Sequence, residues 1–434
     1  MKTVAIYTLG CKLNFSESSE IGRVLESEGY QRVPFGTQAD ITIVHTCSVT
    51  GTAERKTRQT IHKAIRSSPE GIIVAMGCEA QLDPLEVASW KGVNLVLGTH
   101  EKFNLPALLR SYTKQEDPII QVGHVMDNTI FHPAHSEGER TRSFLKIQDG
   151  CDYVCTYCTI PKARGRSRNP SIASLITQAE TISKKGIREI VLTGVNVGDF
   201  GRSTKESFYN LLQQLDQVEQ ILRFRISSIE PNLLNNDLIR FIAESKRIAP
   251  HFHLPLQSGT DKILKLMKRR YATGLFRERV NRIKELLPDA SVGADLIVGF
   301  PGETDDDFKQ TREFVESLPL SYLHVFTYSE RPGTPAAELP DQVPHEVRHE
   351  RSRIMHDLAS KIKNKFYLSQ AGTDKTVIFE HILPDGHMTG WSENYVEVAV
   401  PFDETLLHHE AEVTITRQRQ DQKMAGVLLN AKNR

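Results

Sequence analysis

Residues 149–168 read DGCDYVCTYCTIPKARGRSR and bring three cysteines, Cys151, Cys155 and Cys158, into one short segment. Their spacing is Cys-x3-Cys-x2-Cys, and neither a fourth cysteine nor a second cysteine pair follows downstream. A ferredoxin-like site needs a fourth thiolate, and a zinc ribbon needs a second pair. Three thiolates that hold a four-iron cluster leave one iron open, so the spacing predicts an iron–sulfur site with an exchangeable ligand. Three incidental cysteines in a turn are the plainer alternative.

An open iron of this kind can bind S-adenosylmethionine through its amino and carboxylate groups. One electron from the cluster then cleaves the sulfonium and gives a 5′-deoxyadenosyl radical, which takes hydrogen from an unactivated carbon. The spacing, and its place just after a predicted strand of a β/α unit, resemble the radical S-adenosylmethionine superfamily. The resemblance implies that Tyr157 packs near the adenine of the cofactor.

The other three cysteines each end a predicted strand. YTLGC ends at Cys11, IVHTC ends at Cys47 and VAMGC ends at Cys78. Because the C-terminal ends of parallel strands form one rim, we expect the three thiols to meet at one point. Two alternatives remain open: cysteine is a convenient small residue at tight turns, or a zinc site takes His45 or His62 as its fourth ligand.

The segment pattern predicts an α/β chain of several domains, as its 434 residues also favour. Residues 1–115 alternate strands and helices and predict a parallel-sheet α/β domain. Residues 116–142 mix Pro, Gly, His and charge and read as a linker. Residues 143–366 predict six strands, each followed by a helix, as in a partial (β/α)6 barrel with its chemistry at the C-terminal strand ends. Residues 367–434 predict a small all-β barrel.

Charge and hydropathy restrict the class of protein further. Acidic and basic residues balance at 54 each, so the net charge does not argue for or against a nucleic-acid partner. No apolar run approaches the ~20 residues that span a bilayer. The start, MKTVAIYTLGC, reads as a strand and not as a signal peptide. We therefore expect a cytoplasmic protein with no membrane partner and no disulfides.

Taken together, the two cysteine sets and the C-terminal β-domain resemble the methylthiotransferase family. The strings that carry the resemblance are TLGCKLNFSES, HTCSVT, MGCEAQ, GCDYVCTYCTIPKARGRSR, IVLTGVNVGDFG, ISSIEP, HLPLQSGTDKILKLMKRRY, DLIVGFPGET and YSERPGTPA. The resemblance implies that Cys11, Cys47 and Cys78 hold a second 4Fe-4S cluster whose open iron carries the sulfur to be transferred. It also implies that S-adenosylmethionine is both methyl donor and radical source, and that the tail is a TRAM-like RNA-binding barrel.

Three branches of that family differ in substrate. GCKLN and LTGVNVGDFG look most like the branch that converts N6-threonylcarbamoyladenosine, adenosine 37 beside the tRNA anticodon, to its 2-methylthio derivative. Leu13 and the string FSES depart mildly from that branch. The other branches act on N6-isopentenyladenosine in tRNA and on an aspartate of a ribosomal protein. The implied partners are the tRNA anticodon stem-loop, an electron donor protein and a sulfur source. A hypothesis of another class is a non-catalytic, zinc-stabilised RNA-binding protein.

Polar and glycine residues follow three predicted barrel strands, where the cofactor is expected. The resemblance places the methionine part of S-adenosylmethionine at TGVNVG, and Ser228 and Glu230 suit ribose hydroxyls. An ordinary turn residue is the alternative at each position. The candidates for cofactor contacts are Gly194, Asn196, Ser228, Glu230, Gln257 and Ser258.

Basic residues flank the second cysteine set and recur in the tail. A charge run is usually a solvated face, but these segments are expected near the barrel mouth, where an RNA backbone would lie. The candidates for RNA contacts are Lys162, Arg164, Arg166, Arg168, Lys268, Arg269, Arg270, Arg417 and Arg419.

Overall fold

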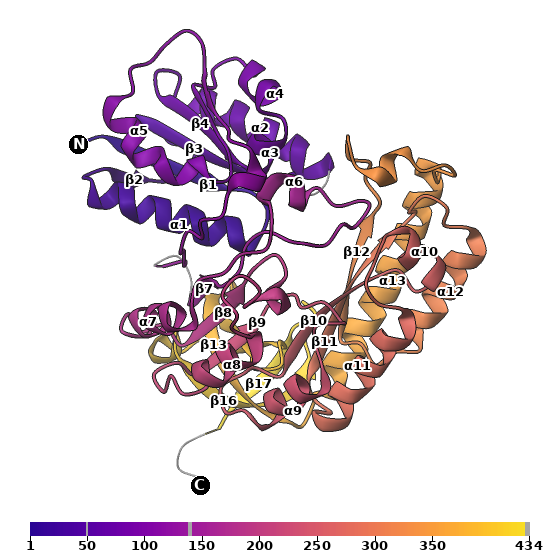
Figure 1. Cartoon of the computed structure of the whole chain (residues 1–434). Coiled ribbons are helices and arrows are strands. Elements are labelled where there is room, and N and C mark those ends of the chain that lie inside the picture. The colour runs from indigo at the N-terminus through magenta and orange to yellow at the C-terminus, as the bar shows by residue number, and fades with distance from the viewer. Residues whose placement is uncertain (49–50, 138–140, 430–434) are drawn as a thin grey trace.

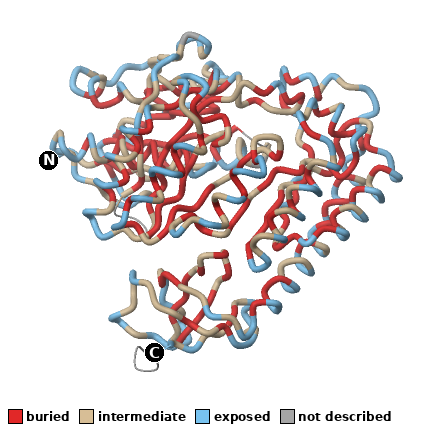
Figure 2. The backbone as a smooth tube through the Cα atoms, turned by 60° about the horizontal axis from the view of Figure 1, so that its bottom comes forward, coloured by how far each residue is buried: buried red, intermediate tan, exposed pale blue. Residues whose placement is uncertain are grey.

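The computed structural model describes residues 1–48, 51–137 and 141–429. The N-terminal α/β domain (indigo in Figure 1) lies above a central barrel, and a small C-terminal barrel (yellow) lies behind the lower part of the molecule. Buried backbone runs through the sheets, and exposed residues line the outer helices and loops (Figure 2). No described helix is long and apolar enough to cross a membrane.

The N-terminal domain is built on one parallel sheet with the strand order β2-β1-β3-β4-β5-β6. Apolar side chains alternate along the strands, so that Ile43 and Val44 of β3 belong to separate hydrophobic cores. Its strands are β1 (Thr3–Thr8), β2 (Gln31–Val33), β3 (Ile41–Thr46), β4 (Ile72–Gly77), β5 (Leu95–Leu97) and β6 (Ile119–Gln121). Its helices are α1 (Lys12–Ser27), α2 (Gly51–Ser67), α3 (Cys78–Leu82), α4 (Pro84–Ser89) and α5 (Leu105–Ser111).

This sheet extends beyond the predicted boundary at residue 115. β6 lies within the segment that we expected to be a linker, and Ile119 pairs with Leu95 of β5. β2 was not predicted either. Both strands span three residues, and each contains a polar residue, unlike the all-apolar β5 of the same length. Residues 138–140 of the expected linker lie outside the described part of the chain.

The central barrel contains six parallel strands within residues 141–366, all of which the structure describes. They form two three-stranded sheets, β7-β8-β9 and β10-β11-β12, which bridges at Phe224–Ile248 and Ser228–His253 join. The strands are β7 (Arg142–Lys146), β8 (Glu189–Thr193), β9 (Arg223–Ile226), β10 (His251–Gln257), β11 (Ser291–Val298) and β12 (Tyr322–Thr327). No described pairing joins β7 to β12, so the predicted partial barrel is confirmed.

Helices cover the outside of the central barrel. Most of them pack on one large apolar core, whereas α10 contributes to a smaller cluster and α6 contacts α3 of the N-terminal domain. They are α6 (Ile160–Arg164), α7 (Ile172–Ser183), α8 (Phe208–Leu215), α9 (Asn236–Glu244), α10 (Asp261–Leu266), α11 (Thr273–Leu286), α12 (Asp305–Glu316) and α13 (His345–Ser369). The loops that follow the strands at their C-terminal ends carry the residues discussed below.

The C-terminal domain is a closed barrel with the strand order β13-β14-β15-β17-β16, as the alternation of short strands and turns predicted. Its strands are β13 (Asp374–Ile382), β14 (His387–Ser392), β15 (Glu397–Pro401), β16 (Glu410–Gln418) and β17 (Met424–Leu428). Arg223 and Arg225 of β9 donate to backbone carbonyls of Thr376 and Ser392 at 2.9 and 3.1 Å. These bonds hold the small barrel against the central one.

Candidate functional site

The structure brings Cys11, Cys47 and Cys78 to one rim. β1, β3 and β4 are neighbours in the sheet, and one of these cysteines follows each strand. Gly10 has φ +93°, and a Cβ there would lie 2.7 Å from Sγ of Cys47, so only glycine lets the Cys11 turn approach that thiol. Burial raises the pKa of the Cys78 thiol, and the neighbouring Cys11 adds to the effect.

His45 and His62 do not complete a zinc site with these thiols. His45 is fully buried, with Ser18 Oγ 2.8 Å from its Nδ1 and Lys102 Nζ 3.3 Å from its Nε2. Burial and the Lys102 ammonium hold its pKa well below the ordinary range, so the ring is neutral and already engaged. His62 is exposed on α2.

The second cysteine group lies in the loop between β7 and α6. Cys155 is buried, Cys151 and Cys158 are half-buried, and all three are free thiols. Burial raises the pKa of Cys151 and Cys158 to about 12, and the neighbouring thiols add to the effect. A metal ion reverses that preference, because a coordinating thiol is deprotonated. Three enclosed thiols without a partner disulfide therefore fit ligation of an iron–sulfur cluster.

Gln148 ties the loop after β8 to this cysteine loop. Its Oε1 accepts hydrogen bonds from the backbone N–H groups of Val195 and Asn196 at 2.9 Å each, and its Nε2 donates to the carbonyl of Gly150 at 2.7 Å. A Cβ at Gly194 would lie 2.9 Å from Gln148 Oε1, which explains glycine at that position. Our sequence reasoning missed Gln148, whose one signal was its place three residues before Cys151.

Two side chains at these strand ends have buried polar atoms without a partner among the described residues, and one of them, Asn196, is a predicted cofactor contact. Asn196 is buried, and its Oδ1 has no hydrogen-bond partner among the described residues; the same holds for the hydroxyl of Ser227. Gln257 has φ +65°, a strained conformation for a residue with a side chain, and Ser258 beside it is fully buried. Unpaired buried polar atoms of this kind are suited to hydrogen-bond a polar ligand at this place.

Arg269 is not on an RNA-facing surface, in contrast to our expectation. Its side chain is 4% exposed and forms an ion pair with Glu230. Its Nη1 lies 3.1 Å from Sγ of Cys155 and 3.4 Å from the hydroxyl of Tyr157. Arg269 therefore orients the cysteine loop, and it already occupies the Glu230 carboxylate that we expected at a ribose.

Arg164 and Arg168 are also buried, and the RNA role predicted for them is a further correction. Arg164 is 1% exposed, with its guanidinium 2.9 Å from Asp149 and 3.0 Å from Glu17. Arg168 lies 2.8 Å from Asp149. They belong to a buried set, called here the interdomain ion cluster, which consists of Glu17, Lys102, Lys146, Asp149, Arg164 and Arg168. The cations Arg164 and Lys102 of this cluster act on Cys78 and offset part of the rise in its thiol pKa that burial causes.

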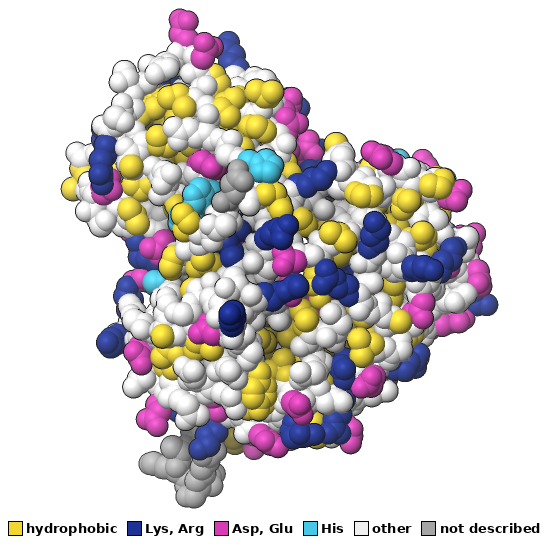
Figure 3. All heavy atoms as spheres, in the orientation of Figure 1, with side chains coloured by type: hydrophobic (Ala, Val, Ile, Leu, Met, Phe, Trp, Pro, Cys, Tyr) yellow, Lys and Arg dark blue, Asp and Glu magenta, His cyan; other side chains and the backbone are white. Residues whose placement is uncertain are grey.

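The other predicted RNA contacts lie at or near the surface. Arg270 stacks over the Tyr153 ring at 3.9 Å, and Arg419 is half-buried and paired with Asp385. Figure 3 shows Lys and Arg side chains spread over the middle of one face, below the N-terminal domain. The exposed members of the predicted set are Lys162, Arg166, Lys268, Arg270 and Arg417.

A cavity of about 520 Å³ lies inside the central barrel, within the size range of ligand pockets. All three domains contribute to its wall. The residues that line it are Gly10, Cys11, Lys12 and Leu13 of the N-terminal domain, Thr193, Gly194, Ser227, Ser228, His251, His253, Asp295, Tyr322 and His324 of the central barrel, and Tyr395 of the C-terminal barrel.

A hydrogen-bonded network forms the floor of this cavity. Asp295 lies 2.9 Å from Nε2 of His253 and 3.2 Å from Nδ1 of His324. Burial alone would raise the pKa of Asp295, but these two hydrogen bonds lower it. The hydroxyl of Tyr322 lies 2.8 Å from His251 and 3.1 Å from His253.

Comparison with known proteins identifies the family. Residues 145–315 match the radical SAM superfamily, and residues 3–98 match uncharacterized protein family UPF0004. The chain is 38% identical to threonylcarbamoyladenosine tRNA methylthiotransferase MtaB of Bacillus subtilis over 96% of this chain and 94% of that protein. The chain belongs to the methylthiotransferase family of radical S-adenosylmethionine enzymes. It is also 32% identical to tRNA-2-methylthio-N(6)-dimethylallyladenosine synthase of Pelotomaculum thermopropionicum, with 96% of each covered.

The fold has a counterpart among solved structures. The radical S-adenosylmethionine methyltransferase TsrM of Kitasatospora setae, solved with cobalamin and a 4Fe-4S cluster bound, aligns with a TM-score of 0.56 over 77% of this chain and 74% of that one. The sequences are 12% identical, so this similarity concerns the fold alone. As a radical SAM methylthiotransferase, the protein uses 4Fe-4S clusters and S-adenosylmethionine, and its two groups of three free thiols fit the clusters, although Cys11 is exposed.

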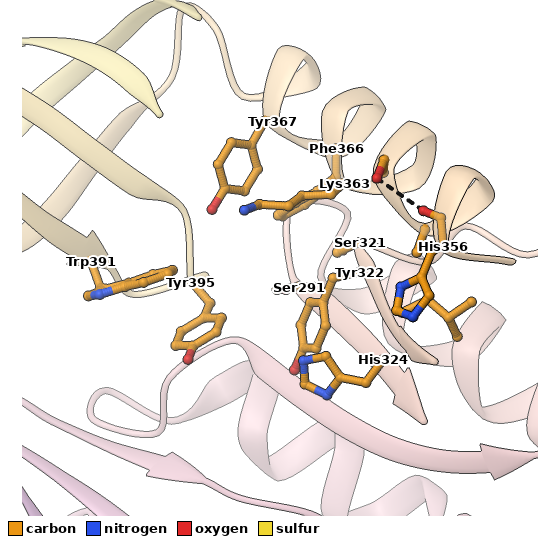
Figure 4. A pocket seen from close by; sticks show the side chains of 13 residues that line it. Ser291, Ser321, Tyr322, His324, His356, Lys363, Phe366, Tyr367, Trp391 and Tyr395 are labelled. Atoms are coloured by element: carbon orange, nitrogen blue, oxygen red, sulfur yellow. Dashed lines mark hydrogen bonds between the residues drawn. The ribbon is translucent and has the colours of Figure 1, made fainter. Parts of the chain in front are cut away.

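A groove leads from the cavity along α13. A second cavity shares Tyr322, His324 and Tyr395 with the first, and Figure 4 shows Trp391 and Tyr395 facing Tyr322 and His324 across it. A third, polar cavity continues past Lys363 to Arg419. In this methylthiotransferase the three cavities thus form one path from Cys11 to the C-terminal barrel.

Proposed function

We propose that this enzyme converts N6-threonylcarbamoyladenosine at position 37 of tRNA, beside the anticodon, to its 2-methylthio derivative. The observation that carries the proposal is the cavity that Cys11 lines together with Gly194 and Ser228. One substrate in that cavity contacts both the rim of the first cysteine group and the strand ends where S-adenosylmethionine is expected. The relatives named for this reaction are more similar to the chain than those named for the dimethylallyladenosine reaction.

The residues divide into two groups in this proposal. Cys151, Cys155 and Cys158 would hold one 4Fe-4S cluster, and the other three cysteines would hold the second. When bound, the first cluster and S-adenosylmethionine supply the radical that takes hydrogen from C2 of the adenosine. Asn196, Ser228 and Ser258 would contact S-adenosylmethionine, with Gly194 letting the backbone approach. Gln148 and Arg269 position the loops that carry these contacts.

The anticodon stem-loop would follow the groove along α13. Trp391 and Tyr395 stack with ring centroids 4.5 Å apart and offer an aromatic platform of the kind that binds splayed bases. Lys363 and Arg419 line the polar cavity of the same path and bring positive charge to it, and Arg417 is exposed two residues before Arg419 in the chain. An electron donor protein and a sulfur source complete the set of partners, and the cytoplasm, where tRNA is modified, is the compartment we propose.

Nucleoside analysis of tRNA from a deletion strain tests this function. We expect the 2-methylthio derivative to disappear and N6-threonylcarbamoyladenosine to accumulate, with restoration by the wild-type gene and none by the Cys155→Ala gene. Loss of the 2-methylthio derivative of isopentenyladenosine instead would favour the second tRNA branch. If the tRNA nucleosides were unchanged and a ribosomal protein had lost a methylthio group on an aspartate, the result would favour the branch that acts on that protein.

A further inference from the structure

Lys12 is an unpaired cation in the wall of the central cavity. It begins α1 directly after Cys11, and its side chain lines the cavity beside the histidine network. Within residues 1–48, 51–137 and 141–429, no acidic side chain or carbonyl lies within ion-pair or hydrogen-bond distance of its ammonium group. Lys12 is solvent-accessible within the cavity. A cation that faces a ligand cavity without a protein partner is free to form a charge-assisted hydrogen bond with an anionic group of the ligand.

The charged groups around Lys12 all have partners. Arg142 lies 2.8 Å from Glu380, and Arg225 lies 2.9 Å from Glu189. Asp295 is held by two histidines, as described above. Because these neighbours compensate one another, Lys12 is the cation among the described residues of this wall that remains available to an anionic group of a bound ligand.

The anion is not expected to be the carboxylate of S-adenosylmethionine. That carboxylate belongs at the open iron of the other cysteine group, and none of Cys151, Cys155 and Cys158 lines this cavity. The substrate adenosine supplies an alternative. A threonylcarbamoyl group carries a free carboxylate at neutral pH, whereas an isopentenyl group carries none.

We propose that Lys12 binds the carboxylate of the amino-acid group on the substrate adenosine and thereby selects the threonylcarbamoyl over the isopentenyl nucleoside. This inference rests on the proposed function and adds the residue that determines its specificity. A charge-assisted hydrogen bond stabilises the correct substrate. An apolar isopentenyl group would instead leave the ammonium group unpaired beside it, and a site built for a polar group rejects analogues that lack it.

Binding of two matched RNAs tests the proposal. One anticodon stem-loop carries N6-threonylcarbamoyladenosine, and the other carries the same group with its carboxylate converted to a primary amide. Kd is measured by fluorescence anisotropy with anaerobically reconstituted protein and no reductant, so that no turnover occurs. We expect the wild type to bind the carboxylate RNA about tenfold or more tightly than the amide RNA.

Substitution of Lys12 should remove that difference. Lys12→Gln should bind both RNAs with the same Kd, Lys12→Arg should retain part of the preference, and Lys91→Gln, an exposed lysine outside the cavity, should retain all of it. Equal Kd values in the wild type would overturn the inference. If Lys12→Gln raised Kd equally for both RNAs, the inference would also be overturned, because that result indicates that Lys12 contacts an RNA phosphate.

A product assay separates this inference from the proposed function. Wild-type protein with reductant, S-adenosylmethionine and sulfide is incubated with the carboxylate RNA, and the nucleosides are analysed by mass spectrometry. If the 2-methylthio product does not form, the proposed function fails. If the product forms while the two RNAs bind equally, the function stands and the role of Lys12 is wrong.

Discussion

Arg164 of α6 and Glu17 of α1 form a buried ion pair, with 3.0 Å between Nη2 and Oε2, although 147 residues separate them in the chain. Glu17 also accepts from Lys102 at 2.5 Å and from Lys146 at 2.7 Å. The Glu17 carboxylate of the N-terminal domain thus anchors two cations of the central barrel, Lys146 and Arg164. The pair also connects the helix after Cys158 to the helix after Cys11, and it holds the two cysteine groups at a set distance.

Glu17→Gln should destabilise the protein strongly. Removal of the carboxylate leaves several buried cations with too little negative charge, which typically costs about 3 kcal/mol or more. Urea unfolding at neutral pH measures the effect. Glu20→Gln is the matched control on the same helix, since Glu20 is more exposed and pairs with Arg23, and we expect a loss under about 1 kcal/mol. Equal losses for the two variants would contradict this account of the interdomain ion cluster.

Glu189 should make stability depend on acid pH. Burial alone would raise its pKa, but Arg223, Arg225 and Arg142 lower it below the ordinary value of 4.5. A lowered carboxyl pKa stabilises the folded state above the unfolded pKa, and the stabilisation is lost as the pH falls below about 4.5 toward the folded value. The difference in Tm between wild type and Glu189→Gln should be constant from pH 7 to about 5 and then shrink. A difference that grows below pH 5 would refute this assignment.

Gln148→Ala should weaken S-adenosylmethionine binding while leaving the iron content unchanged. The substitution leaves the N–H groups of Val195 and Asn196 without their acceptor and frees the loop after β8. An unsatisfied buried donor costs about 1–3 kcal/mol, so we expect Kd to rise about tenfold or more. Calorimetric titration measures Kd. The control is Gln310→Ala, an exposed glutamine on α12 that bonds Asp306; an unchanged Kd for Gln148→Ala would show that the loop does not need this support.

Substitutions in the two cysteine groups should affect different steps of the reaction. Cys155→Ala should abolish cleavage of S-adenosylmethionine, whereas Cys47→Ala should retain cleavage and lose sulfur insertion. Each variant should contain about four irons in place of about eight, because each group holds one four-iron cluster. Iron and sulfide analysis of anaerobically purified protein is the measurement. Equal loss of cleavage in both variants would mean that the division of labour is wrong.

Local sequence accounts for much of the fold and of the cysteine sites. Apolar runs bounded by turn residues predicted β1, β3, β4, β5 and the strands of the central barrel, since these runs report local backbone and packing preferences. The Cys-x3-Cys-x2-Cys spacing is itself local, so it was visible without a fold. The rim formed by Cys11, Cys47 and Cys78 was predictable because parallel strands direct their C-terminal ends to one edge.

The basic residues near Cys158 could not be assigned in the same way. Arg164, Arg168 and Arg269 look like surface cations in the sequence, but their partners Glu17, Asp149 and Glu230 are set by tertiary contacts. Whether a cation faces water or a buried acid depends on which segments pack together, and a charge pattern along the chain does not carry that information.

The sequence by itself determined the domain types, the two sets of three thiols and the family to which they point, because these depend on local periodicity and spacing. Only the tertiary structure decided which charged groups are neutralised inside the protein and which remain open. Lys12 is the clearest case: its cavity has walls from all three domains, with Tyr395 and Cys11 far apart in the chain. Electrostatic compensation is a property of three-dimensional neighbours, and that is why the fold was needed to find this residue.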